Sequence, residues 1–300
     1  MSARVMDERV VLTADDEVQL VGTLTRPGAD GKVPAALLIN GSGPLDRDSN
    51  MPGQTLDVAP ALAAALAERG TASLRFDKRG VGESDGEYLA TSFDRETEDA
   101  SLALHVLRRT GGVEPARVSV VGHSVGATIA IRLAARHEWL AGAVLLCAAS
   151  SPGAEVMRWQ SERIAASLRG LQRLGARRFL RRQEEVRQAL LEGDTLDVVG
   201  GLPARWLREY MEYDPAHDLP RIQCPVLAIT GRKDLQVDAD DVGRIGEQVR
   251  GPFSGETPAN LTHVLRTHAG RASLSSYRAQ LRRPMDPDLL DTVASWVAAR

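Results

Sequence analysis

The chain has 300 residues, and its 37 lysine and arginine residues against 40 aspartate and glutamate residues give a formal net charge of −3. This balance gives no electrostatic basis for binding nucleic acid, and no stretch approaches the roughly 18 consecutive apolar residues expected of a membrane span. The amino-terminal segment MSARVMDERV lacks the apolar core of a secretory signal, so a cytoplasmic protein is expected.

Short apolar segments bounded by glycine or proline alternate with helix-like segments along most of the chain. An antiparallel pair of strands is expected at 9–14 and 18–27, separated by a polar turn. The later strand candidates are as apolar as parallel strands covered on both faces, and they lie at 33–40, 71–76, 117–122, 141–148 and 224–231. Helix candidates lie near 56–69, 92–110, 124–136 and 288–299. This alternation predicts an α/β fold whose mostly parallel sheet is covered by helices on both faces.

The alternation stops over residues 151–220, which contain no strand-like segment and are rich in Arg, Leu, Ala, Gln and Glu. We expect a helical cap here, inserted between two late strands of a core formed by residues 1–150 and 221–300. The first part of the insertion is basic; a solvated helix face is favoured, and a site for an anionic ligand remains an alternative. Four aromatic residues are candidates for lining a pocket or for packing between cap helices: Trp159, Trp206, Tyr210 and Tyr213.

The segment GHSVG at 122–126 lies between a strand candidate and a helix candidate. A serine in a tight strand-to-helix turn presents its hydroxyl at the carboxyl edge of a sheet, and Gly122 and Gly126 allow the strand and helix to approach closely. The five-residue pattern alone is weak evidence, because glycine and serine are common in this chain. Its neighbours support the interpretation that Ser124 is a nucleophile.

A nucleophilic serine needs a base to take its proton and an acid to orient that base, and here they should follow in the order acid, then histidine. Asp234 comes directly after the strand candidate 224–231, where ligands meet open parallel sheets. It is favoured over three carboxylates that suit the first turn of a helix, Asp238, Asp240 and Asp241. For the base, His263 is favoured over His268.

The loop after the strand candidate 33–40 suits the binding of a developing oxyanion. Its glycines permit close approach of the backbone, so the N–H of Ser42 is one expected donor. The N–H of Val125, the residue after the nucleophile, is the other. Further candidates for the pocket and its loop are Asn40, Gly41, Gly43 and His123.

Cysteine and histidine are too sparse for a disulfide framework or a metal centre. Cys147 and Cys224 lie in or beside apolar segments, where a thiol usually serves as a small buried hydrophobe. The six histidines are scattered singly, without the paired spacing of metal ligands. We therefore expect neither a metal nor another cofactor.

Five motifs follow one another along the chain: NGSGPLDRD at 40–48, FDKRGVGES at 76–84, GHSVG at 122–126, GRKDLQV at 231–237 and NLTH at 260–263. In this order they resemble the serine α/β-hydrolases, in particular the esterase-like and serine-aminopeptidase-like members, over most of the chain. The resemblance implies an α/β-hydrolase fold, with Ser124 as nucleophile, Asp234 as orienting acid and His263 as base. Asn40 stands where that family usually has histidine, which leaves the backbone donor in place but can alter how the loop is anchored.

The expected activity is hydrolysis of a carboxylic ester or related acyl bond of a small-molecule substrate through an acyl-enzyme. Peptidase or amidase, thioesterase and acyltransferase activities use the same groups and remain alternatives, as does a non-catalytic ligand-binding protein of this fold. A serine at this turn disfavours dehalogenase and epoxide-hydrolase chemistry, which needs an aspartate nucleophile. The physiological substrate and the oligomeric state, including a homo-oligomer, are left open by the sequence.

Overall fold

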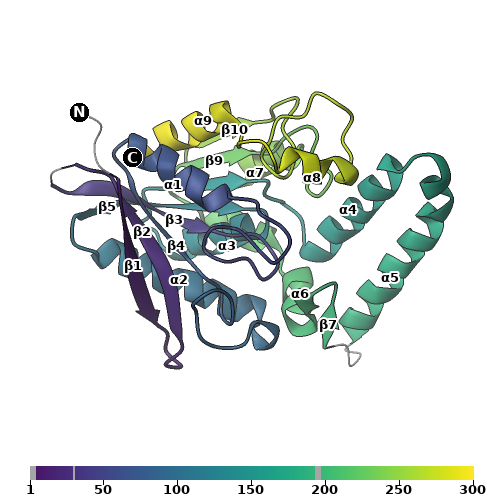
Figure 1. Ribbon diagram of the computed structural model, residues 1–300, viewed down its shortest axis with the longest axis horizontal. Coiled ribbons are helices and arrows are strands. Elements are labelled where there is room, and N and C mark those ends of the chain that lie inside the picture. The colour runs from purple at the N-terminus through teal and green to yellow at the C-terminus, as the bar shows by residue number, and fades with distance from the viewer. Residues whose placement is uncertain (1–4, 30, 193–196) are drawn as a thin grey trace.

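The computed structural model describes residues 5–29, 31–192 and 197–300. Residues 1–4 of the amino-terminal segment and residues 193–196 of the expected cap therefore lie outside the described ranges. An eight-stranded sheet in the order β1-β2-β4-β3-β5-β6-β9-β10 forms the centre of the molecule (Figure 1). Its strands are β1 (Met6–Thr13), β2 (Gln19–Arg26), β3 (Val33–Ile39), β4 (Ala72–Phe76), β5 (Val113–His123), β6 (Gly142–Leu146), β9 (Val226–Ile229) and β10 (Phe253–Glu256).

The sheet is antiparallel at one edge and parallel elsewhere. β1 pairs with β2, and β2 with β4, in antiparallel fashion, whereas the pairs from β4 across to β10 are parallel. All residues of β3, β4, β6 and β9 are buried, because helices cover both faces of this part of the sheet. The predicted antiparallel pair and the predicted parallel strands are confirmed.

Among the described residues, helices cover the sheet in two groups, one on each face. The first group is α1 (Val58–Glu68) and α9 (Pro287–Ala298), which pack side by side and share one apolar cluster. The second group, with the other apolar cluster, is α2 (Phe93–Arg109), α3 (Val125–Arg136) and α7 (Asp241–Gln248). The predicted α/β fold with helices on both faces is confirmed.

Helix α2 illustrates why these segments fold as they do. Phe93, Ala100 and Leu107 recur at helical spacing and are buried against the sheet. The side chain of Ser92 caps the amino terminus by accepting a hydrogen bond from the N–H of Arg95, at 3.1 Å. Acidic residues in the first turn and basic residues in the last turn complement the helix dipole.

The described part of the segment between β6 and β9 contains the helices α4 (Gly153–Ser167), α5 (Ala176–Glu192) and α6 (Ala204–Glu212). α4 and α5 project away from the sheet, and α6 lies between them and the core (Figure 1). The prediction that this segment contains no strand is wrong, because β7 (Val198–Val199) and β8 (Leu202–Pro203) form a small antiparallel pair. Strands of two residues are too short to produce an alternating pattern.

Short helices complete the described structure. They are η1 (Tyr88–Ala90), η2 (Gly170–Gly175), η3 (Pro215–His217), η4 (Leu219–Arg221), η5 (Leu274–Ser276) and α8 (Tyr277–Gln280). No helix within the described ranges has both the length and the hydropathy needed to span a bilayer.

Candidate active site

Ser124 occupies a strained turn between β5 and α3. Its φ of 56° and ψ of −124° lie in a region that residues with a side chain rarely adopt. The N–H of Ser124 donates to the carbonyl of Leu146 on the neighbouring strand β6, at 2.8 Å. The turn is therefore held at the carboxyl edge of the sheet, with the hydroxyl at the cavity described below.

Glycine is required on both sides of this turn. A Cβ at Gly122 would collide with the backbone carbonyl of Gly126, and a Cβ at Gly126 would collide with the carbonyl of Ile39 on β3. These clashes involve backbone atoms, which cannot move aside without shifting a strand or a helix. The close approach expected for Gly122 and Gly126 is confirmed.

His263 lies between Ser124 and Asp234. Its Nε2 is 3.1 Å from Oγ of Ser124, and its Nδ1 is 2.8 Å from Oδ2 of Asp234. A carboxylate can only accept, so the Nδ1 proton points at Asp234 and the Nε2 lone pair faces the serine hydroxyl. The structure thus brings together the three residues that the sequence predicts, from three separate loops.

Both carboxylate oxygens of Asp234 accept hydrogen bonds. Its Oδ1 accepts hydrogen bonds from the N–H groups of Gln236 and Val237, at 2.7 and 3.0 Å. Burial alone would raise the pKa of this carboxyl group, but the charge and hydrogen bond of His263, together with these two N–H groups, outweigh burial and hold the pKa below its usual value. This environment favours the carboxylate form of Asp234.

The alternative acids lie around the start of helix α7. Asp238 accepts a hydrogen bond from the N–H of Asp240, and Asp240 pairs with Arg232. Asp241 is buried and accepts from the hydroxyl of Ser150, at 2.5 Å. These contacts match the helix-start role expected for them.

The alternative base, His268, has a different environment from His263. Its N–H donates to the carbonyl of Asn260, and its own carbonyl accepts from Lys233. The hydrogen bonds of the Ser124 hydroxyl and the Asp234 Oδ2 go to His263 instead.

His123 packs against the ring of His263 and hydrogen-bonds to its backbone. Its buried ring lies with its centroid 5.1 Å from that of His263, and its Nε2 donates to the backbone carbonyl of His263, at 2.9 Å. Burial is the main reason that the pKa of His123 falls to about 3, so the ring is neutral at ordinary pH. The sequence suggested His123 as a pocket residue; its ring anchors the His263 backbone and is not part of the cavity lining in the described residues.

Ser42 and Val125 both line the cavity next to Ser124. Within the described ranges, neither backbone N–H has a hydrogen-bond partner. For Val125 this follows from its place in the first turn of α3, where N–H groups have no partner inside the helix. Gly41 lies against the same residue, since a Cβ added to it would be 3.2 Å from Cβ of Ser124.

The side chain of Asn40 anchors the loop that carries Ser42. Its Nδ2 donates to the carbonyl of Asp46, and its Oδ1 accepts from the hydroxyl of Ser49, each at 2.6 Å. Gly43, with a φ of 98°, lies in the turn between Asn40 and Asp46. Asparagine at position 40 thus closes the loop on itself.

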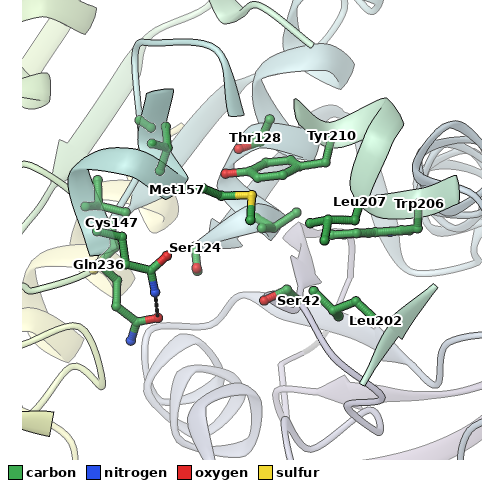
Figure 2. Close-up of a pocket in the computed structure, with 15 residues that line it drawn as sticks. Ser42, Ser124, Thr128, Cys147, Met157, Leu202, Trp206, Leu207, Tyr210 and Gln236 are labelled. Carbon is green, nitrogen blue, oxygen red and sulfur yellow. Dashed lines mark hydrogen bonds between the residues drawn. The ribbon is translucent and has the colours of Figure 1, made fainter. Parts of the chain in front are cut away.

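A cavity of about 180 Å³ opens over Ser124 (Figure 2). Its walls include Met157 of α4 and, from α6, Trp206, Leu207 and Tyr210. On another side, Gln160 of α4 donates to Gln236 at 3.2 Å, the bond drawn as a dashed line in Figure 2. The cavity is smaller than the roughly 300–1,000 Å³ common for small-molecule sites, and one wall comes from the segment between β6 and β9.

The sequence left two roles open for four aromatic residues, lining a pocket or packing between helices, and the structure shows both. Trp206 and Tyr210 line the cavity and also pack on Phe93 of α2, with ring centroids 5.6 Å apart in each case. Tyr213 packs on Phe93 and donates to Asp218. Trp159 lies beside a separate cavity near α7.

Among the described residues, three potential metal ligands lie close together: His123, Cys147 and His263, whose ligand atoms are within 4.8 Å of one another. Both ring nitrogens of His263 already have partners, and burial raises the pKa of the Cys147 thiol well above its usual value. A metal binds the thiolate, so this environment disfavours ligation. The absence of a metal stays a prediction.

Residues 53–252 match the family described as serine aminopeptidase, S33. The chain belongs to this family. The matched range includes Ser124 and Asp234 and ends before His263. Among curated relatives of the S33 chain, esterase EstD of Thermotoga maritima is 28% identical over 284 residues, covering 93% of this chain and 65% of EstD. The chain thus spans just under two thirds of that relative's length.

Solved structures share the fold of this S33 family member. Alpha/beta hydrolase GrgF from Penicillium sp. sh18 superposes with a TM-score of 0.66 at 18% identity, covering 98% of this chain and all of GrgF. Est1E from Butyrivibrio proteoclasticus, solved with ferulic acid, gives a TM-score of 0.64 at 17% identity, covering 97% of this chain and all of Est1E. At such identities the likeness shows the α/β-hydrolase fold.

Two residues near the site have no counterpart in the sequence predictions. Lys78 lies within FDKRGVGES and contacts the loop of Ser42, and Glu96 of α2 pairs with it. Each has a weak signal in the sequence. Lys78 follows the strand candidate 71–76 by two positions, and Glu96 falls on the helix face that also bears Phe93 and Ala100.

Proposed function

We propose that the protein is a serine hydrolase that cleaves a carboxylic ester through an acyl-enzyme. The supporting observation is the hydrogen-bonded series Ser124, His263 and Asp234, in which Ser124 lines a cavity. In this proposal Ser124 is the nucleophile, His263 the general base and Asp234 the group that orients and charge-stabilises the imidazole.

The reaction proceeds in two acyl transfers. Nε2 of His263 takes the hydroxyl proton as Oγ of Ser124 bonds to the ester carbonyl carbon, and the oxyanion lies between the N–H groups of Ser42 and Val125. The tetrahedral intermediate expels the alcohol, which receives the proton from Nε2. Water then attacks the acyl-serine with His263 again as base, and the acid and free Ser124 are released.

The preference for an ester rests on a curated relative. EstD is an esterase by name, and we extend that activity to this chain as part of the proposal. The cavity supports a compact acyl group, because its volume is about 180 Å³ and part of its lining is apolar, including Met157, Leu202 and Leu207. Amide substrates use the same groups but have a poorer leaving group, so an ester should be cleaved faster.

We further propose that residues 151–220 act as a cap over the core formed by residues 1–150 and 221–300. Support comes from α4 and α6, which supply one wall of the cavity over Ser124. Residues 193–196 of this range lie outside the described structure. The cap would set the size of the acyl group, while the core would supply the reacting groups.

Labelling by a fluorophosphonate probe tests the nucleophile, and turnover of a short-chain p-nitrophenyl ester tests the activity. We expect the wild type to be labelled and active and Ser124→Ala to be neither. His263→Ala should lose about a thousandfold or more in kcat, since such residues act as a unit. His268→Ala is the matched control and should retain activity. Undiminished labelling of Ser124→Ala, or an equal loss in His268→Ala, would show that the assignment is wrong.

An aminoacyl p-nitroanilide measured in parallel separates esterase from aminopeptidase activity. A higher kcat/KM for the p-nitroanilide than for the ester would replace the ester proposal by amide cleavage on the same residues.

A further inference from the structure

Three buried polar side chains join the loop of Ser42 to helix α6. Nζ of Lys78 donates to the carbonyl of Gly41 at 2.5 Å and lies 2.6 Å from Oε1 of Glu96. The other carboxylate oxygen of Glu96 accepts from Nε1 of Trp206, also at 2.6 Å. Lys78 and Glu96 are each 7% exposed and Trp206 is 3% exposed, so these contacts form away from bulk water.

The carbonyl that Lys78 holds belongs to the peptide whose N–H is that of Ser42. A trans peptide is planar, and its C=O and N–H point in opposite directions, so an ammonium fixed on the oxygen also fixes the direction of the N–H. The same contact draws electron density toward the oxygen, which makes the N–H a stronger donor.

A stabilising role alone accounts poorly for this arrangement. Removing an ammonium and a carboxylate from water costs several kcal/mol each, roughly what their mutual attraction returns, so a buried pair is weak evidence for stability. An apolar pair would fill the same space. The carboxylate of Glu96 instead balances the charge of Lys78 and leaves the ammonium directed at the Gly41 carbonyl.

We propose that Lys78 is a positioning residue that orients and polarises the Ser42 N–H toward the oxyanion, with Glu96 and Trp206 holding Lys78 in place. This inference rests on the proposed acyl-transfer function. Trp206 and Ser42 both line the cavity (Figure 2). The linkage therefore connects the cavity-facing side of α6 to the donor peptide.

Lys78→Met tests the proposal, with Lys32→Met as the control for removing a lysine at an exposed position. The donor acts on charge that develops in the transition state, so kcat for a short-chain p-nitrophenyl ester should fall about ten- to a hundredfold with KM little changed. A trifluoromethyl ketone of the same chain length, which forms an oxyanion on Ser124, should bind more weakly by a similar factor. Lys32→Met should match the wild type in both measurements.

Trp206→Phe provides the second variant. It keeps an aromatic ring on α6 but removes the N–H that holds Glu96, so kcat and ketone affinity should fall together by a smaller factor. If Lys78→Met does not fold, as judged by its thermal transition, Trp206→Phe alone tests the positioning role of Lys78. Wild-type ketone affinity in Trp206→Phe would then overturn the proposal.

Each other outcome has one interpretation. A folded Lys78→Met with wild-type kcat and ketone affinity overturns the positioning role while leaving the esterase proposal intact. A loss of thermal stability with unchanged kcat also overturns it. Failure of the wild type to hydrolyse the ester or to be labelled at Ser124 contradicts the proposed function itself.

Discussion

The buried ring of His123 makes the stability of the folded chain depend on pH. The pKa of His123 is about 3 in the folded protein, mainly because burial disfavours the charged ring, against 6.5 for an ordinary histidine. Between these values the unfolded chain binds a proton that the folded chain does not, so acid favours unfolding. The contribution of His123 to stability is therefore complete above pH 6.5 and is lost as the pH falls toward 3.

His123→Gln should remove this part of the acid sensitivity. In urea unfolding at pH 7.5 and pH 5, the wild type should lose about 2 kcal/mol more free energy of unfolding than the variant, from roughly 1.4 kcal/mol per pH unit below 6.5. His217→Gln serves as control, because the side chain of His217 is 84% exposed. An identical pH dependence in wild type and His123→Gln would contradict the prediction.

Single residues differ in how far the sequence predicts them. Ser124, Asp234 and His263 could be selected because each follows a strand candidate or motif in an order that the chemistry requires, and the structure places them within hydrogen-bond distance. Their catalytic roles stay predictions. Lys78 and Glu96 could not be selected, because their contact depends on how β4, α2 and α6 pack together.

At the scale of elements, the strand-to-helix turn around Ser124 depends on two glycines. Gly126→Ala should destabilise the protein and remove activity, since the new Cβ would overlap the Ile39 carbonyl on β3 and force α3 away from the sheet. We expect the free energy of unfolding to fall by about 1–3 kcal/mol or more, the size seen for overpacked core sites. Thermal unfolding and ester turnover measure the two effects.

The matched control is Gly243→Ala on helix α7. A Cβ at Gly243 has no neighbour within 4 Å among the described residues, and alanine is the better helix former by about 1 kcal/mol. This variant should be slightly more stable than the wild type and fully active. A Gly126→Ala protein as stable as Gly243→Ala would show that α3 can shift without cost.

The elements themselves were predictable to different degrees. Buried parallel strands leave a clear signature, and all five later candidates in the sequence correspond to strands of the sheet. β10 has only four residues and three of them are exposed, so its sequence carries little apolar signal. β7 and β8 were missed for the same reason of length.

At the scale of the whole molecule, the cavity lies where the segment between β6 and β9 meets the core. Phe93 of α2 forms the centre of this contact, with Trp206, Tyr210 and Tyr213 around it. The sequence predicts helices here but not which face turns toward the core, because both pocket lining and mutual packing favour aromatic residues. In the structure Trp206 and Tyr210 serve both purposes, so the position of α6 and the shape of the cavity are set together.

Met157 offers a way to change the size of the cavity from the side of α4. It lies on α4, is half-buried and lines the cavity together with the aromatic side chains of α6 (Figure 2). In a space of about 180 Å³ a short acyl group should fit best, so wild-type kcat/KM should be highest for short p-nitrophenyl esters and decline along a series from acetate to decanoate. Met157→Ala should move the optimum toward longer acyl groups.

The volume of the Met157 side chain, rather than its thioether, should set the preferred acyl-chain length. Met157→Leu should therefore keep the wild-type chain-length profile. Because α4 projects from the sheet and Met157 is only half-buried, neither substitution should lower the melting temperature by more than a few degrees. An unchanged profile in a stable Met157→Ala would mean that acyl groups leave the cavity by another side. The hydrogen bond between Gln160 and Gln236 marks that side, so it would be the next place to look for the size limit.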